Sequence, residues 1–147
     1  MKTILFLCTG NSARSIMAEA YMNAAGKDRW RAFSAGSHPT GRPNPLALQT
    51  LARHGIEPGA PRSKSWEEFA GENAPPLDVV VTVCDNAAGE ACPVFPARSG
   101  AQVKKLHWSF PDPAAAEGDE AARRGAFEDV FRAIGARIDD FLARDSQ

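Results

Sequence analysis

The residues best suited to chemistry in this sequence are Cys8 and Arg14, a nucleophile and a cation six positions apart. Residues 3–8 form a short apolar run typical of a buried strand, and the apolar spacing of residues 15–25 predicts a helix. A turn from strand to helix in an open parallel sheet is a common ligand site, and the N–H groups and dipole of the helix attract anions. We therefore expect an oxyanion-binding loop made of Thr9, Gly10, Asn11, Ser12, Ala13, Arg14 and Ser15.

Each part of this loop has a role in holding or attacking an oxyanion. Gly10 and Asn11 can adopt positive φ, which lets successive backbone amides point inward. The planar guanidinium of Arg14 can bind two oxygens of the anion at once. Arg14, the amides and the helix dipole should lower the pKa of the Cys8 thiol from ~8.5 into the ~3.5–7.5 range, so that it attacks as a thiolate. The alternative is a buried cysteine at a strand end beside a surface arginine.

Strands and helices alternate along the rest of the chain. Apolar and β-branched runs at residues 30–35, 79–83 and 102–108 predict three further strands. Residues 45–54, 65–70 and 120–143 have the spacing or the capping residues of helices. This order indicates an α/β fold, a small doubly wound four-stranded parallel sheet of flavodoxin-like order 2-1-3-4 with helices on both faces. We expect one domain over residues 1–147, because no linker or repeat divides the chain.

Cys84 and Asp112 are expected at the same edge of the sheet as Cys8. Cys84 ends the third strand, which in this order neighbours the first strand at ~4.8 Å, so the two sulfurs could meet. A second thiol there could supply the electrons for a reduction. Asp112 follows the fourth strand and could protonate an oxygen that leaves the oxyanion. The alternative for Asp112 is a turn cap before Pro113.

Cys92 lies eight positions after Cys84, and a helical segment between them would separate the two by ~12 Å. Disulfides need Cα atoms within about 7 Å, so a bond between these residues requires the segment to unwind. The alternatives are an inert surface thiol at Cys92 and a core residue at Cys84. The three cysteines and three histidines show no zinc-ligand spacing, so we predict no metal site.

Composition excludes several classes of protein. The 17 Lys and Arg residues balance 18 Asp and Glu residues to a net charge of −1, so no basic field recruits nucleic acid or a membrane surface. Only four consecutive apolar residues, 4–7, precede Cys8, and no stretch approaches the ~20 residues of a membrane span. An odd number of cysteines does not suggest a disulfide framework. We expect a soluble, cytoplasmic protein.

The segment from Cys8 to Ser15 resembles the phosphate-binding loop of the low-molecular-weight tyrosine phosphatase fold. The rest of the chain resembles, more specifically, the arsenate reductases built on that fold. The segments that carry the resemblance span most of the chain and are residues 33–36, 62–66 and 81–88, Cys92-Pro93, His107-Trp108 and Asp112-Pro113.

This resemblance implies the reduction of arsenate to arsenite, a detoxifying reaction of arsenic resistance, without a cofactor. Cys8 would attack arsenate held by the loop and Arg14, with Asp112 as the general acid. Cys84 would then attack Cys8 and release arsenite, and Cys92 would attack Cys84. The resemblance further implies thioredoxin as the reductant of the Cys84–Cys92 pair, and phosphate or sulfate as analogues of the substrate.

Other functions remain open at this point. A tyrosine phosphatase would use the same loop through a Cys8-phosphate intermediate, although phosphatases of this fold usually carry a cysteine at Ala13 and aromatic residues in place of residues 114–116. An oxyanion-binding or thiol-sensing module would not need Asp112. The spacing from Cys84 to Cys92 is one residue longer than in the better known thioredoxin-coupled relatives, so glutaredoxin with a small thiol is a second candidate reductant.

Some relatives also bind potassium beneath the loop. Asn11, Glu19 and Ser34 match three of the ligands of that ion. No aspartate matches within residues 62–66, so the sequence does not assign the ion.

Overall fold

The computed structural model describes residues 1–71, 73–84, 95–97 and 102–145. Its centre is a parallel sheet of four strands in the order β2-β1-β3-β4, which confirms the predicted order. The strands are β1 (Lys2–Leu7), β2 (Trp30–Ala35), β3 (Val79–Thr82) and β4 (Lys104–His107). Their last residues are in register, Leu7 beside Ala35 and Thr82, and Thr82 beside His107. The segments that follow the strands therefore start from one edge of the sheet.

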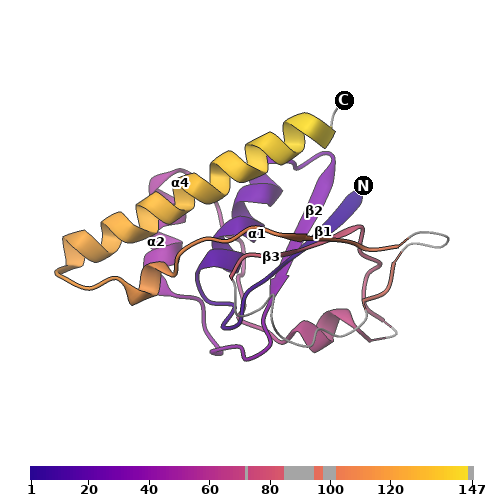
Figure 1. Ribbon diagram of the computed structural model, residues 1–147, viewed down its shortest axis with the longest axis horizontal. Helices are drawn as coiled ribbons and strands as arrows, with labels where there is room; N and C mark the ends of the chain where they lie inside the picture. The colour runs from indigo at the N-terminus through magenta and orange to yellow at the C-terminus, as the bar shows by residue number, and fades with distance from the viewer. Residues whose placement is uncertain (72, 85–94, 98–101, 146–147) are drawn as a thin grey trace.

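Side chains of β1 alternate between the two faces of the sheet, as the pleat requires. Ile4 and Phe6 pack into a core shared with the helices α1 (Arg14–Ala25), α2 (Pro45–Arg53) and α4 (Glu120–Asp145). Figure 1 shows α4 as a long helix that runs across α1 and α2. Leu5 and Leu7 face the other side, where Phe69 of the 3-10 helix η1 (Trp66–Phe69) covers them. Both faces of β1 are thus buried, which explains its continuous apolar run.

The predicted elements agree with the structure to within about two residues at their ends. Capping explains two of the starts. The Asn44 side chain accepts a hydrogen bond from the Leu46 amide at 2.9 Å and begins α2. Ser65 accepts one from the Glu67 amide at 3.2 Å and begins η1, which is a 3-10 helix. Residues 85–91, for which we considered a helix, lie outside the described residues, so the separation of Cys84 and Cys92 stays a prediction.

The end of α4 is attached to the edge of the sheet where the strands begin. The Asp145 carboxylate accepts hydrogen bonds from Lys2 Nζ and from Trp30 Nε1, each at 2.9 Å. The bond from Lys2 is the main reason why the pKa of Asp145 is lowered. Within the described part of the chain, no helix is both long and apolar enough to cross a membrane.

Candidate active site

The predicted oxyanion loop connects the end of β1 to the start of α1. Cys8 directly follows β1, and its amide donates to the Ala35 carbonyl at 3.2 Å, which continues the pairing with β2 by one residue. Asn11 has a φ of +45°, the positive value expected for a loop that turns its amides inward. Among the described residues, no side chain caps the N-terminus of α1 at Ala13. The positive end of the helix dipole is therefore left for a ligand.

The loop that follows β2 orients the peptide groups of the oxyanion loop from outside. The amides of His38, Thr40 and Asn44 donate to the carbonyls of Thr9, Gly10 and Ser12, at 2.9, 3.0 and 2.8 Å. A trans peptide points its N–H opposite to its C=O, so the next amide after each of these carbonyls points away from the loop that follows β2. We did not predict these three hydrogen bonds from the sequence. Their signal was the run of turn residues from Ser37 to Asn44, which we left unexplained.

Residues 62–65, which we call the strap, bind the oxyanion loop through two hydrogen bonds. Ser63 Oγ donates to the Gly10 carbonyl at 3.0 Å, and the Lys64 amide donates to Asn11 Oδ1 at 2.8 Å. Asn11 in turn donates from Nδ2 to Ser15 Oγ at 2.9 Å, and both side chains are fully buried. These bonds hold Asn11 in place, and Asn11 has a positive φ that is unfavourable for a residue other than glycine.

Gly36 lies between the strap and the loop and allows their close approach. Its amide donates to the Lys64 carbonyl at 2.9 Å. A Cβ at this position would lie 2.4 Å from the Thr9 carbonyl oxygen and 2.5 Å from the Cys8 carbonyl oxygen. Because those are backbone atoms, only glycine fits here without displacing the loop.

The structure brings Arg14 and Asp112 together, as the sequence predicted. Arg14 Nη2 lies 4.0 Å from Asp112 Oδ2, and Nη1 donates to the Phe110 carbonyl at 3.0 Å. Asp112 Oδ1 accepts a hydrogen bond from the Ala114 amide at 3.0 Å and so caps the 3-10 helix η2 (Pro113–Ala115). One oxygen of Asp112 therefore caps the turn, as the alternative interpretation expected, while the other faces Arg14. The role of Asp112 as a general acid stays a prediction.

Cys8 and Cys84 also lie close together, near enough for Cys84 to raise the pKa of the Cys8 thiol. Both residues are buried, and the Thr9 amide donates to Cys84 Sγ at 3.4 Å. Hydrogen bonding to Cys84 and burial raise the pKa of the Cys8 thiol, and Arg14 lowers it by less. The expected lowered pKa is thus wrong for this arrangement of the two thiols. That expectation considered only the loop, the dipole and Arg14, and it left out hydrogen bonding to Cys84 and burial, which are the two largest causes of the raised pKa.

Two of the three residues considered for potassium, Asn11 and Glu19, contact Lys64. Its ammonium lies 3.8 Å from Glu19 Oε1 and donates to the Arg62 carbonyl at 3.1 Å, while its amide binds Asn11. Ser34 Oγ is buried and has no hydrogen-bond partner among the described residues. Burial raises the pKa of the Glu19 carboxyl, while Lys64 and the neighbouring Ser34 act against this shift. Since a lysine ammonium already accompanies the carboxylate, these residues do not fit a potassium ion. In the described residues no group of three or more His, Cys, Asp or Glu could hold a metal.

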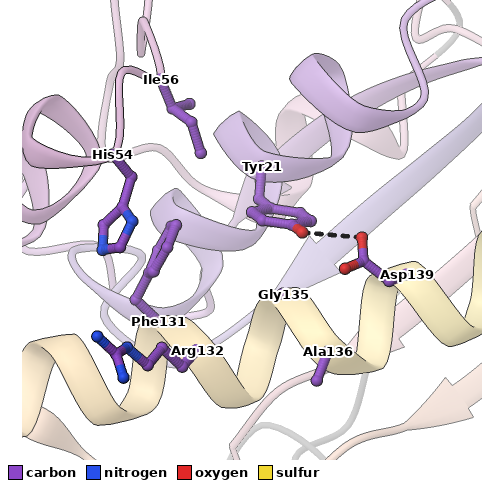
Figure 2. Close-up of a pocket in the computed structure, with 8 residues that line it drawn as sticks. All are labelled: Tyr21, His54, Ile56, Phe131, Arg132, Gly135, Ala136 and Asp139. Carbon is purple, nitrogen blue, oxygen red and sulfur yellow. Dashed lines mark hydrogen bonds between the residues drawn. The ribbon is translucent and has the colours of Figure 1, made fainter.

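A separate hollow of about 410 Å³ lies between α1, the end of α2 and α4 (Figure 2). Figure 2 shows Tyr21 lying over α4 beside Gly135, with its hydroxyl donating to Asp139 Oδ1 at 2.8 Å. Burial and this bond raise the pKa of Tyr21 to about 12. A Cβ at Gly135 would lie 2.9 Å from the Tyr21 ring, so the glycine lets the ring pack against the helix. None of the predicted site residues is among those that line this hollow.

The described part of the chain thus unites Cys8, Arg14, Cys84 and Asp112 at one edge of the sheet. Cys92, the third predicted thiol, lies outside the described residues. Three of the four come from predicted strand ends and the loops after them, and Arg14 comes from the first turn of α1. A nucleophile, an anion-binding cation, a carboxyl group and a second thiol together can support attack on an oxyanion followed by thiol chemistry.

Comparison with known proteins identifies the family. Residues 3–146 match the family described as low molecular weight phosphotyrosine protein phosphatase. The arsenate reductase of Bacillus licheniformis is 41% identical over 140 residues, which are 95% of this chain and 94% of the relative. A solved arsenate reductase in a phosphate-binding state has a TM-score of 0.75 at 24% identity and 98% coverage of both chains.

A third relative is the thioredoxin-dependent arsenate reductase of Corynebacterium glutamicum, with a TM-score of 0.70 at 22% identity. The match covers 100% of this chain and 64% of that one. At such identities the two solved structures show the shared fold, while the family match and the curated relative show common descent. The chain therefore belongs to the low molecular weight phosphotyrosine protein phosphatase family, and its sequence groups with the arsenate reductases built on that fold.

Proposed function

We propose that this protein reduces arsenate to arsenite through an adduct on Cys8 and a relay of thiols from Cys8 to Cys84 to Cys92. The observation that carries the proposal is the proximity of two buried thiols, because Cys84 lies near enough to Cys8 to raise the pKa of its thiol, and the Thr9 amide donates to Cys84 Sγ at 3.4 Å. Hydrolysis of a phosphate ester needs only Cys8, Arg14 and Asp112. A second thiol in contact with the nucleophile is needed when electrons must pass to the substrate.

In the first step, the Cys8 thiol gives its proton to an arsenate oxygen and attacks arsenic, while the loop amides and Arg14 hold the other arsenate oxygens. A sulfur–arsenic bond forms, and the hydroxyl made in this way leaves as water after Asp112 gives it a second proton. The distance of 4.0 Å between Arg14 and Asp112 supports this role, because the carboxyl then reaches an anion that Arg14 holds.

In the second step, Cys84 attacks the Cys8 sulfur of the adduct. A Cys8–Cys84 disulfide forms, and the electron pair of the broken sulfur–arsenic bond stays with arsenic, which leaves as arsenite. The positions of the two residues support this step, since Leu7 and Thr82 pair directly at the ends of β1 and β3. No movement of the sheet is needed to bring the sulfurs into contact.

In the third step, Cys92 attacks Cys84, and Cys8 leaves as a thiolate ready for another arsenate. The Cys84–Cys92 disulfide then takes two electrons from a dithiol partner. Thioredoxin is the proposed partner, supported by the dependence that the Corynebacterium glutamicum relative is named for. Glutaredoxin with a small thiol is the competing reductant. Both belong to the cytoplasm, where we place this protein, because that compartment keeps thiols reduced.

Arsenate turnover measured in parallel with a thioredoxin system and a glutaredoxin system tests the proposal. We expect turnover with thioredoxin for the wild type and none for Cys84→Ser with either system. Both proteins should hydrolyse p-nitrophenyl phosphate at similar low rates, because that reaction bypasses Cys84. Rapid hydrolysis by the wild type without arsenate reduction would overturn the proposal in favour of a phosphatase. Oxyanion binding without either reaction would instead indicate a binding module.

A further inference from the structure

We propose that Lys64 is a positioning residue of the oxyanion loop, and that its buried ammonium serves as a built-in cation in place of a dissolved one. The proposal rests on the assignment of the Cys8 loop as the oxyanion site, and it extends that assignment to the layer beneath the loop. In the proposed role, Lys64 does not touch the anion. It acts through Asn11 and Glu19.

The first observation is the burial of a charged pair with no direct role in the proposed chemistry. Lys64 is 8% exposed, and the side chain of Glu19 is 15% exposed. Burial lowers the pKa of Lys64 and raises the pKa of Glu19, while the opposite charge of each partner acts against these shifts. Buried charges are costly unless paired, so each member of the pair requires the other.

The second observation is that the same lysine contacts the loop. Its amide donates to Asn11 Oδ1, and its carbonyl accepts from the Gly36 amide. Asn11 has the positive φ that turns the loop, so a shift of the strap would be transmitted to the amides that hold the anion. The side chain of Lys64 fixes the strap, because its ammonium bonds to the Arg62 carbonyl and faces Glu19 on α1.

Without the Lys64 ammonium, the oxygen atoms around it would have no cation. The Glu19 carboxylate, the Ser34 hydroxyl near it and the Arg62 carbonyl would leave an oxygen-lined space and an uncompensated negative charge beneath an anion site. Such a space would take a small cation from solution. In the intact protein the ammonium occupies it, and no dissolved cation is required.

Binding of inorganic phosphate, measured by calorimetry at constant ionic strength, tests this without arsenate turnover. The variant is Lys64→Ala, and the matched control is Lys105→Ala, which removes an exposed lysine of β4. We expect Lys64→Ala to weaken phosphate binding by roughly 5- to 150-fold, the range typical of coupling between two sites. Replacing tetramethylammonium chloride with methylammonium chloride should restore the affinity in a saturable manner. The wild type and Lys105→Ala should bind equally in tetramethylammonium, methylammonium and potassium chloride.

A purely structural lysine would give a different pattern. Lys64→Ala would then unfold at a lower temperature but bind phosphate as the wild type does, without a response to methylammonium. That result would overturn the proposal, as would wild-type binding that strengthens with potassium. Failure of the wild type to bind phosphate at all would instead refute the loop assignment itself.

If Lys64→Ala does not fold, the doubly neutral variant Glu19→Gln/Lys64→Ala replaces it. This variant lacks the buried unpaired carboxylate, so we expect it to fold. It should bind phosphate more weakly than the wild type and show no rescue by methylammonium. Phosphate affinity equal to that of the wild type would overturn the proposal.

Discussion

Cys8 and Cys84 lie close together after two adjacent strands, and the amide of Thr9, the residue that follows Cys8, donates to Cys84 Sγ at 3.4 Å. The first amide of the oxyanion loop is therefore directed to the second thiol. An anion that uses this amide has to displace Cys84 from it. Substrate binding and the release of Cys84 as a nucleophile are thereby coupled in the proposed reaction.

This contact predicts that Cys84→Ala lowers the pKa of Cys8. The wild-type pKa is raised because Cys84 hydrogen-bonds to the Cys8 thiol and because burial disfavours the thiolate. Removing Cys84 deletes the largest of these effects and leaves the attraction of Arg14. Alkylation of Cys8 by iodoacetamide, followed against pH, should therefore begin at lower pH, by about one unit or more, which is at least a tenfold gain in thiolate near neutrality.

Mass mapping of the alkylated peptide identifies the sulfur that reacts. Phosphate should slow alkylation of Cys8 in both proteins, because the anion fills the loop. The distant conservative variant Met22→Leu, buried in the helical core, should leave the pH profile unchanged. A Cys84→Ala profile identical to that of the wild type would contradict the coupling of the two thiols.

Asp112→Asn should slow formation of the arsenic adduct by ~10²–10⁴-fold, the usual contribution of a positioned general acid. An asparagine oxygen can still accept the Ala114 amide, so the cap of η2 should remain. Single-turnover kinetics measure the first effect, and phosphate calorimetry should show nearly unchanged binding. Asp119→Asn, which alters a cap at the start of α4, is the control with unchanged kinetics. An unimpaired Asp112→Asn enzyme would leave Asp112 only its capping role.

The sequence predicted the elements that position the site because their signals are local. The apolar run of β1, the β-branched run of β3 and the caps at Asn44 and Ser65 each act within a few residues. Parallel pairing then forces the ends of β1 and β3 together, so the meeting of Cys8 and Cys84 could also be predicted. Chain order and sheet geometry were sufficient for that part of the site.

The support of the loop could not be predicted in the same way. The bonds from His38, Thr40 and Asn44 are made by backbone amides, which every residue type other than proline carries. The turn residues of this segment indicate a loop, but they do not specify which carbonyls its amides bind. The pairing of Lys64 with Glu19 joins residues far apart in the chain. The raised pKa of Cys8 depends on hydrogen bonding to Cys84, and proximity alone did not specify it.

Gly36→Ala should disrupt the oxyanion loop although Gly36 touches no ligand. Its new Cβ would lie 2.4 and 2.5 Å from two carbonyl oxygens of the loop, far inside van der Waals contact. We expect a loss of about 1–3 kcal/mol in the free energy of unfolding, as for other overpacked sites, together with weaker phosphate binding. Gly71→Ala, where a Cβ meets nothing within 4 Å, is the matched control for urea unfolding and calorimetry. Equal behaviour of the two variants would contradict the close approach at Gly36.

Cys92→Ser should release one arsenite per enzyme molecule and then stop. The first two steps need only Cys8 and Cys84, which already lie close together, so the variant should end as a Cys8–Cys84 disulfide. Oxidised wild type should instead carry Cys84–Cys92, a bridge that requires the intervening segment to leave any helical form and that a partner can then reduce. Mass mapping of both products under non-reducing conditions distinguishes the two linkages. Continuous turnover of Cys92→Ser with thioredoxin would refute the three-thiol relay, because a thiol from outside the chain would then resolve Cys8 or Cys84.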